Sequence, residues 1–132
     1  MALAPIKVQL IGHDGIDGDH RRLVELIERI DVELADASYE LCGELFELLH
    51  ELAEVHFERE EAILDRLGWP GLEAHCLYHQ DLLDQLRALK EMSARMVDKE
   101  TLYRQFADMA GFVVHDLLDG DLAFKDFLAE HG

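Results

Sequence analysis

Five polar residues with metal-binding chemistry stand at positions where a helical pattern would place leucine. His56 and Glu60 are four residues apart, about one helical turn, so their side chains face the same way. His75 and His79 repeat this spacing, and His20 occupies an apolar position in an earlier segment. Imidazoles combined with carboxylates suit iron, zinc, copper or manganese. The spacing therefore predicts a metal site inside the protein.

Plain structural roles for these residues are the alternative. A single histidine in a core is more often a hydrogen-bonded structural residue than a ligand. A buried polar group without a partner costs roughly 2 kcal/mol or more, so five such residues on three segments are hard to explain by chance. A metal accounts for all of them together, because it supplies positive charge and accepts their lone pairs. A bundle without a metal is the weakest of the alternatives.

The apolar residues recur at three- and four-residue steps, which indicates helices. Prolines occur only at positions 5 and 70, and no stretch alternates convincingly at period two. The predicted helices span 19–36, 38–67, 71–96 and from 99 to 127 or 128. Candidate caps are Asp17 or Asp19, Ser38 and Gly68. Short connections predict an all-α, antiparallel, up-down-up-down four-helix bundle, formed as one domain over residues 1–132 with an irregular leader at 1–17.

Composition excludes several classes of function. The formal net charge of −17 argues against binding to nucleic acid and to anionic membranes, both of which need basic patches. No apolar run reaches the ~20 residues that span a bilayer, and the first residues do not resemble a signal peptide. We therefore expect a cytoplasmic protein, and the acidic surface favours a monomer.

Taken together, four segments of the chain resemble the bacterial hemerythrins. These segments are His20 in Ile-Asp-Gly-Asp-His, His56 and Glu60 in His-Phe-Glu-Arg-Glu-Glu, His75 and His79 in His-x-x-x-His, and Asp121 in Asp-Leu-Ala-Phe-Lys-Asp-Phe-Leu. The resemblance extends over about residues 13–128. Each segment alone is a weak signal, and their combination is specific.

The resemblance implies a four-helix bundle around two irons that bind O2 reversibly. One iron would take His75, His79 and a residue of the last helix. The other would take His20 and His56 and keep a position open for O2 or nitric oxide. Glu60 and Asp121 stand at the positions of bridging carboxylates, beside an oxo or hydroxo bridge. Manganese or zinc could replace iron at such donors.

The last helix departs from the family pattern by one residue. The family places its final histidine five residues before the bridging aspartate, but that spacing from Asp121 leads to Asp116. On a regular helix, which advances about 100° per residue, Asp116 faces the apolar stripe and His115 faces outward. A π-bulge, eased by Gly120, would instead bring His115 inward. One of His115 and Asp116 is expected to be a ligand, not both, with Asp119 as a weaker third candidate.

The candidate ligand pocket depends on the same shift. The family usually carries a tryptophan four residues before its last histidine, and Phe112 takes that place if Asp116 is the ligand. If His115 is the ligand, the place falls to Gly111. Leu23 and Leu117 are the other candidate lining residues. Ordinary core packing explains these apolar residues equally well.

Three functions remain open from the sequence. The first is an O2-binding protein for storage, delivery or sensing, with no catalytic residues. The second is a di-iron oxidase, peroxidase or nitric oxide reductase, favoured if Asp116 makes the site more anionic. The third is a metal store or a signalling module. We expect O2 binding rather than catalysis.

Overall fold

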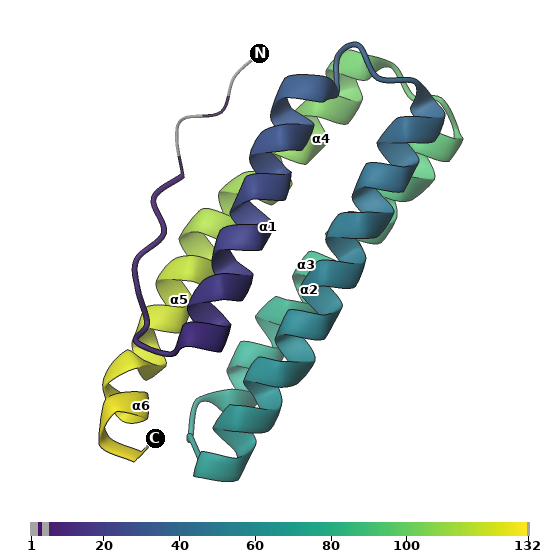
Figure 1. The fold of residues 1–132 in the computed structure, drawn as a ribbon. Helices are drawn as coiled ribbons and strands as arrows, with labels where there is room; N and C mark the ends of the chain where they lie inside the picture. The colour runs from purple at the N-terminus through teal and green to yellow at the C-terminus, as the bar shows by residue number, and fades with distance from the viewer. Residues whose placement is uncertain (1–2, 4–5, 132) are drawn as a thin grey trace.

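The computed structural model describes residue 3 and residues 6–131, with residues 116, 117 and 119 described by their backbone alone. The described residues are helical and contain no strand. In chain order the elements are α1 (Asp14–Glu33), α2 (Tyr39–Leu67), α3 (Leu72–Ala94), α4 (Lys99–Phe112), a π-helix (Val113–Leu118), α5 (Asp119–Asp121), a 3₁₀ turn (Leu122–Phe124) and α6 (Lys125–His131). In Figure 1, α1, α2, α3 and the rod that continues from α4 lie lengthwise beside one another, each antiparallel to the next. The predicted all-α bundle is confirmed.

Caps define where the second and fourth rods begin. Ser38 accepts a hydrogen bond from the backbone N–H of Leu41 and caps α2, as predicted. Gly68 ends α2 at φ 75°, a left-handed conformation that glycine adopts without strain. Asp98 caps α4 through the N–H of Thr101. These side chains satisfy backbone groups that a helix end leaves free.

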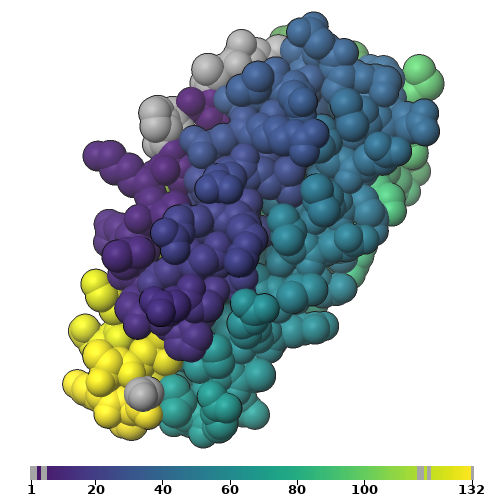
Figure 2. All heavy atoms as spheres, viewed as in Figure 1, coloured from purple at the N-terminus to yellow at the C-terminus, as the bar shows by residue number. Residues whose placement is uncertain are grey.

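The first helix begins five residues earlier than predicted. The N-cap is His13, whose Nδ1 accepts from the N–H of Ile16 at 3.2 Å, and not Asp17 or Asp19. Asp17 lies inside α1 and accepts backbone N–H groups of Ile11 at 2.7 Å and Gly12 at 3.1 Å. The irregular leader therefore ends at residue 13 and is held against the start of α1. Figure 2 shows it lying along this face of the bundle.

The apolar core is divided into two clusters. The end cluster consists of Ile11, Ile16, Leu64, Phe124 and Leu128, and the main cluster fills the rest of the bundle. Along α1, His20 follows Ile16 of the end cluster and precedes Leu23 of the main cluster. The candidate ligands on the other rods occupy the same level, so a polar layer separates the two apolar clusters.

The fourth rod changes its helical period beside this layer. Val113–Leu118 forms a π-helix, and a 3₁₀ turn follows at Leu122–Phe124. π-Helical segments are uncommon and occur often at functional sites. Among the described residues, no helix is both long and apolar enough to cross a membrane.

Candidate metal centre

Side chains from all four rods meet in the polar layer, and each is no more than 5% exposed. His20 comes from α1 and Asp121 from the end of α5. The others are His56 and Glu60 of α2 and His75 and His79 of α3. The structure thus brings together the six residues that the sequence analysis named with a single assignment. Their helical spacing is the reason, since residues four apart project from one face.

Glu60 lies at the centre of the cluster. Its Oε2 is 2.9 Å from Nε2 of His56, and its Oε1 is 2.7 Å from Nε2 of His75. The same Oε1 lies 3.2 Å from Nε2 of His79, while Oε2 lies 3.7 Å from Nε2 of His20. One buried carboxylate therefore reaches histidines of three rods.

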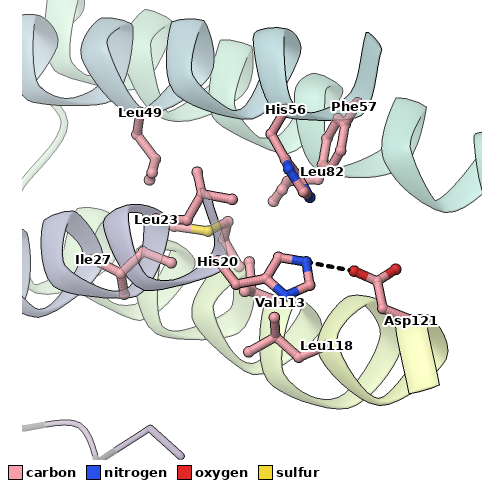
Figure 3. Close-up of a pocket in the computed structure, with 11 residues that line it drawn as sticks. His20, Leu23, Ile27, Leu49, His56, Phe57, Leu82, Val113, Leu118 and Asp121 are labelled. Atoms are coloured by element: carbon pink, nitrogen blue, oxygen red, sulfur yellow. Dashed lines mark ion pairs between the residues drawn. The ribbon is translucent and has the colours of Figure 1, made fainter. Parts of the chain in front are cut away.

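Asp121 completes the cluster from the opposite side. Its Oδ2 lies 2.7 Å from Nε2 of His20, and its Oδ1 lies 2.7 Å from Nε2 of His75. Figure 3 shows His20 pointing toward Asp121, with His56 entering from the facing helix. Asp121 thus contacts histidines of α1 and α3, two of the three helices whose histidines Glu60 also reaches.

The donor atoms fall into two groups that share both carboxylates. The first group is His20, His56, Glu60 and Asp121, and the second is Glu60, His75, His79 and Asp121. Within each group the candidate ligand atoms all lie within 4.8 Å of one another. Two adjacent cations, each held by two histidines and both contacted by the shared carboxylates, fit this arrangement.

Unpartnered atoms in the cluster support that fit. Oε2 of Glu60, Oδ1 of Asp121, Nε2 of His79 and Nε2 of His20 have close charged neighbours, but none of these contacts has the geometry of a hydrogen bond. Nδ1 of His20 is buried without a hydrogen bond. Cations between these atoms would satisfy those that converge on the centre, and the donor chemistry is that of iron, manganese or zinc.

Electrostatics bind the cluster together when no metal is present. Burial alone lowers the pKa of His20, but Asp121 and Glu60 outweigh it and raise this pKa to about 9. The same opposing effects raise the pKa of His75 to about 9. Burial raises the pKa of Glu60, yet its four histidine neighbours bring it well below its usual value. Protons thus occupy the place of cations, and metal binding must release them.

Two further carboxylates contact the outer nitrogens of the histidines. Asp19 Oδ2 lies 3.0 Å from Nδ1 of His56, and Glu61 Oε2 lies 3.0 Å from Nδ1 of His79. Sequence reasoning missed both as part of the site. The available signal was adjacency, because Asp19 directly precedes His20 and Glu61 directly follows Glu60.

The π-helix does not bring His115 into the cluster. It starts at Val113, two residues before His115, and leaves this side chain exposed. The bulge considered from the sequence lay between His115 and Asp121, whereas the observed π-helix already begins at Val113, and His115 faces outward. The side chains of Asp116 and Asp119, the other candidates on this rod, lie outside the described residues.

A small apolar cavity adjoins the first donor group. Its volume is about 20 Å³, enough for roughly one water-sized molecule. Its polar walls are His20, His56 and Asp121, and its apolar walls include Leu23, Ile27, Leu49, Leu82, Val113 and Leu118 (Figure 3). Leu23 was predicted as a lining residue. Leu118 was not, and the side chain of its neighbour Leu117 lies outside the described residues.

Phe112 does not line this cavity, contrary to prediction. It ends α4, is half-buried, and faces Tyr78 with the ring centroids 6.4 Å apart. The change of helical period directly after Phe112 accounts for the difference, since Val113 and Leu118 of the π-helix take the wall positions.

Aromatic rings enclose the second donor group. Phe57 stacks on His79 at 3.9 Å between centroids, with the two planes 5° apart. Trp69 and Phe124 meet His75 edge-on at 5.6 and 5.4 Å. The two groups therefore differ, because the cavity adjoins the first while rings cover the histidines of the second.

The fold and the donor set define a helical-bundle metal protein whose histidines and carboxylates form a paired site. The family model described as "Hemerythrin HHE cation binding domain" matches residues 12–121. The chain therefore belongs to the hemerythrin family, as its resemblance implied.

Two relatives agree with this assignment. A bacteriohemerythrin of Stenotrophomonas maltophilia (strain R551-3) is 30% identical over 122 residues, covering 92% of this chain and 78% of that protein. A bacteriohemerythrin of Clostridium acetobutylicum (strain ATCC 824) is 26% identical over 123 residues, covering 88% of this chain and 93% of that protein. The similarity thus extends over most of each chain.

Proposed function

We propose that this chain binds two iron ions in the polar layer and O2 in the adjoining cavity, as a store, carrier or sensor of O2. The observation that supports this most strongly is the pair of four-residue donor groups sharing both Glu60 and Asp121. A single-metal site would not need two buried carboxylates that each reach histidines on two sides.

Each ligand has a defined role in this proposal. His20 and His56 would hold one iron, His75 and His79 would hold the other, and the carboxylates of Glu60 and Asp121 would be shared by both, with an oxo or hydroxo group as a further ligand. When bound, iron would supply the electrons that O2 requires, while the side chains of this site would hold the metals and enclose the ligand. Manganese or zinc would fit the same donors without the same redox chemistry.

The cavity suits a small apolar ligand. Leucine, isoleucine, valine and methionine side chains form most of its surface and disfavour water. Since it adjoins His20 and His56, the first iron is the one that would meet O2 or nitric oxide. The rings over His75 and His79 keep other molecules from the second iron.

A di-iron oxidoreductase is the second candidate function. The observation that favours it is the exposed position of His115, which leaves four histidines among the described side chains of the cluster. If a carboxylate takes the place of a fifth histidine, the site becomes more anionic, which stabilises oxidised metal and disfavours release of intact O2.

Metal analysis and visible spectroscopy test both candidates. The protein is loaded with ferrous iron without air, analysed for metal, and cycled between O2 and an inert gas. Two irons per chain and an absorption band that appears and fades with O2 support reversible binding. A band that decays irreversibly favours the enzyme, and a single metal or a preference for zinc rejects the iron pair. His75→Gln should lose iron, whereas His131→Gln, at an exposed terminal position, should behave as wild type.

A further inference from the structure

Two carboxylates outside the donor cluster determine which nitrogen of two histidines faces the metals. A carboxylate only accepts hydrogen bonds, so Nδ1 of His56 donates to Asp19 and Nδ1 of His79 donates to Glu61. The Nε2 lone pair of each ring is then left to point into the cluster. Asp19 and Glu61 are called the outer carboxylates below.

The outer carboxylates are distributed evenly over the two donor groups. His56 belongs to the first group and His79 to the second. Each group therefore has one histidine whose orientation and proton position are set from outside. A carboxylate on the far nitrogen raises the basicity of the imidazole toward its metal.

The charge of Asp19 is compensated by two arginines. Nη1 of Arg59 lies 2.9 and 3.1 Å from its two oxygens, and Nη1 of Arg22 lies 2.8 Å from Oδ1. The Asp19 side chain is 12% exposed, whereas the side chains of Arg22 and Arg59 are 62% and 47% exposed, so water screens part of the arginine charge. Two guanidinium groups draw electron density away from the Asp19–His56 pair.

Glu61 has a different neighbour. Its Oε1 accepts from the thiol of Cys76 at 3.0 Å, while Oε2 holds His79. A thiol is an uncharged and weak hydrogen-bond donor, so this neighbour compensates little of the Glu61 charge. The Glu61 side chain is 34% exposed. Among the described residues, no arginine forms an ion pair with it. Neighbouring side chains therefore compensate the negative charge of Glu61 less than that of Asp19.

We propose that Asp19 and Glu61 are positioning residues whose unequal compensation makes the two metal sites inequivalent. His79 is the more electron-rich ligand, so the metal held by His75 and His79 is easier to oxidise than the metal beside the cavity. This inference rests on the proposed iron pair and adds that its two metals differ in how easily they are oxidised.

Amide substitutions separate orientation from charge. Glu61→Gln and Asp19→Asn keep an oxygen that accepts from Nδ1–H but lose the negative charge. Glu61→Ala and Asp19→Ala lose both. Loss of such outer partners typically costs about 10–100-fold in metal affinity, so the alanine variants should bind Co²⁺ that much more weakly in spectroscopic titrations. Melting of the metal-free proteins, followed by circular dichroism, checks that each variant folds.

The reduction potential of the iron-loaded protein is the decisive readout. Glu61→Gln and Asp19→Asn should raise it, because less negative charge remains to stabilise oxidised metal. Arg59→Gln should lower it, since it uncovers the charge of Asp19. Arg104→Gln, an exposed arginine that pairs with Glu100, is the matched control and should leave the potential unchanged.

The sign and the rank of these shifts test the proposal. It requires opposite shifts for Asp19→Asn and Arg59→Gln, and a larger shift for Glu61→Gln than for Asp19→Asn. Shifts of one sign, equal shifts, or no shift in a protein that still binds two irons would overturn it while leaving the proposed function intact. A wild-type protein that binds no metal pair would overturn both.

Discussion

Glu60 and Asp121 lie on different rods of the bundle and meet at one histidine. Nε2 of His75 is 2.7 Å from Oε1 of Glu60 and 2.7 Å from Oδ1 of Asp121. A single nitrogen cannot donate one proton fully to both oxygens. Two carboxylate oxygens this close to one nitrogen require positive charge between them, from a proton or from a metal ion. The first two predictions concern these two forms of the site.

Removing the charge of Glu60 should abolish the paired site. Glu60→Gln leaves the shape nearly unchanged but takes away the carboxylate that both donor groups share. We expect metal affinity to fall by more than about 100-fold, beyond the effect typical of outer partners, as measured by competition with a chelating dye. Glu51→Gln, on the exposed face of α2, is the control. Two tightly bound metals in Glu60→Gln would contradict the assignment of Glu60.

The metal-free protein should lose stability as the pH rises from about 6.5 to 9. The folded-state pKa values of His20 and His75 are raised to about 9 from the ordinary 6.5. The folded chain therefore binds more protons than the unfolded chain in this window, and stability falls with increasing pH. Their contribution is complete below about pH 6.5 and is lost through pH 9. Urea denaturation with a chelator present measures this, and a flat or rising free energy of unfolding would contradict it.

Enlarging the cavity should expose the proposed iron pair to water and speed its oxidation in air. Leu23→Ala removes an apolar wall and should cost about 2–5 kcal/mol of stability, while admitting water beside the site. We expect faster oxidation of the ferrous protein in air, followed by visible absorption. Leu45→Ala, equally buried in the main cluster but not lining the cavity, should cost similar stability without that acceleration. Equal oxidation rates in the two variants would show that the cavity wall does not protect the ferrous site.

The leader should be released by a change at Asp17. This buried carboxylate accepts the N–H groups of Ile11 and Gly12, and Asp17→Ala leaves both without their acceptor. We expect a loss of about 1–3 kcal/mol and faster proteolysis before residue 13. Asp36→Ala, in the exposed turn after α1, supplies the comparison. Unchanged proteolysis would show that other contacts hold the leader.

Helical periodicity was sufficient to predict the bundle and the six polar side chains that meet in its core. His20 and His79 interrupt apolar stripes, and a polar residue in such a stripe is recognisable without a structure. Capping by Ser38 and Gly68 was equally readable, because the hydroxyl of a serine and the backbone freedom of a glycine both act locally. The start of α1 was missed because Gly15 and Gly18 lower helix propensity, while the contacts of Asp17 with the leader are tertiary.

Two features of the site could not be predicted from the helical periodicity of the sequence. The π-helix depends on how the fourth rod fits its neighbours, so the register of His115 and Phe112 could not be derived from a constant angle per residue. Asp19 and Glu61 belong to a chain with 29 acidic residues, most of which simply face solvent. Only the packing of neighbouring helices distinguishes these two from the others.

The polar layer between the two apolar clusters would link the proposed metal binding to the stability of the folded chain. Residues as distant in sequence as His20 and Asp121 are joined there, and bound metals would close the intervening segments into loops much as covalent cross-links do. A newly made chain without iron has only protons to hold the layer together. If metal binds as proposed, the metal-free chain would open more often than the metal-bound chain, and proteases would cleave it faster.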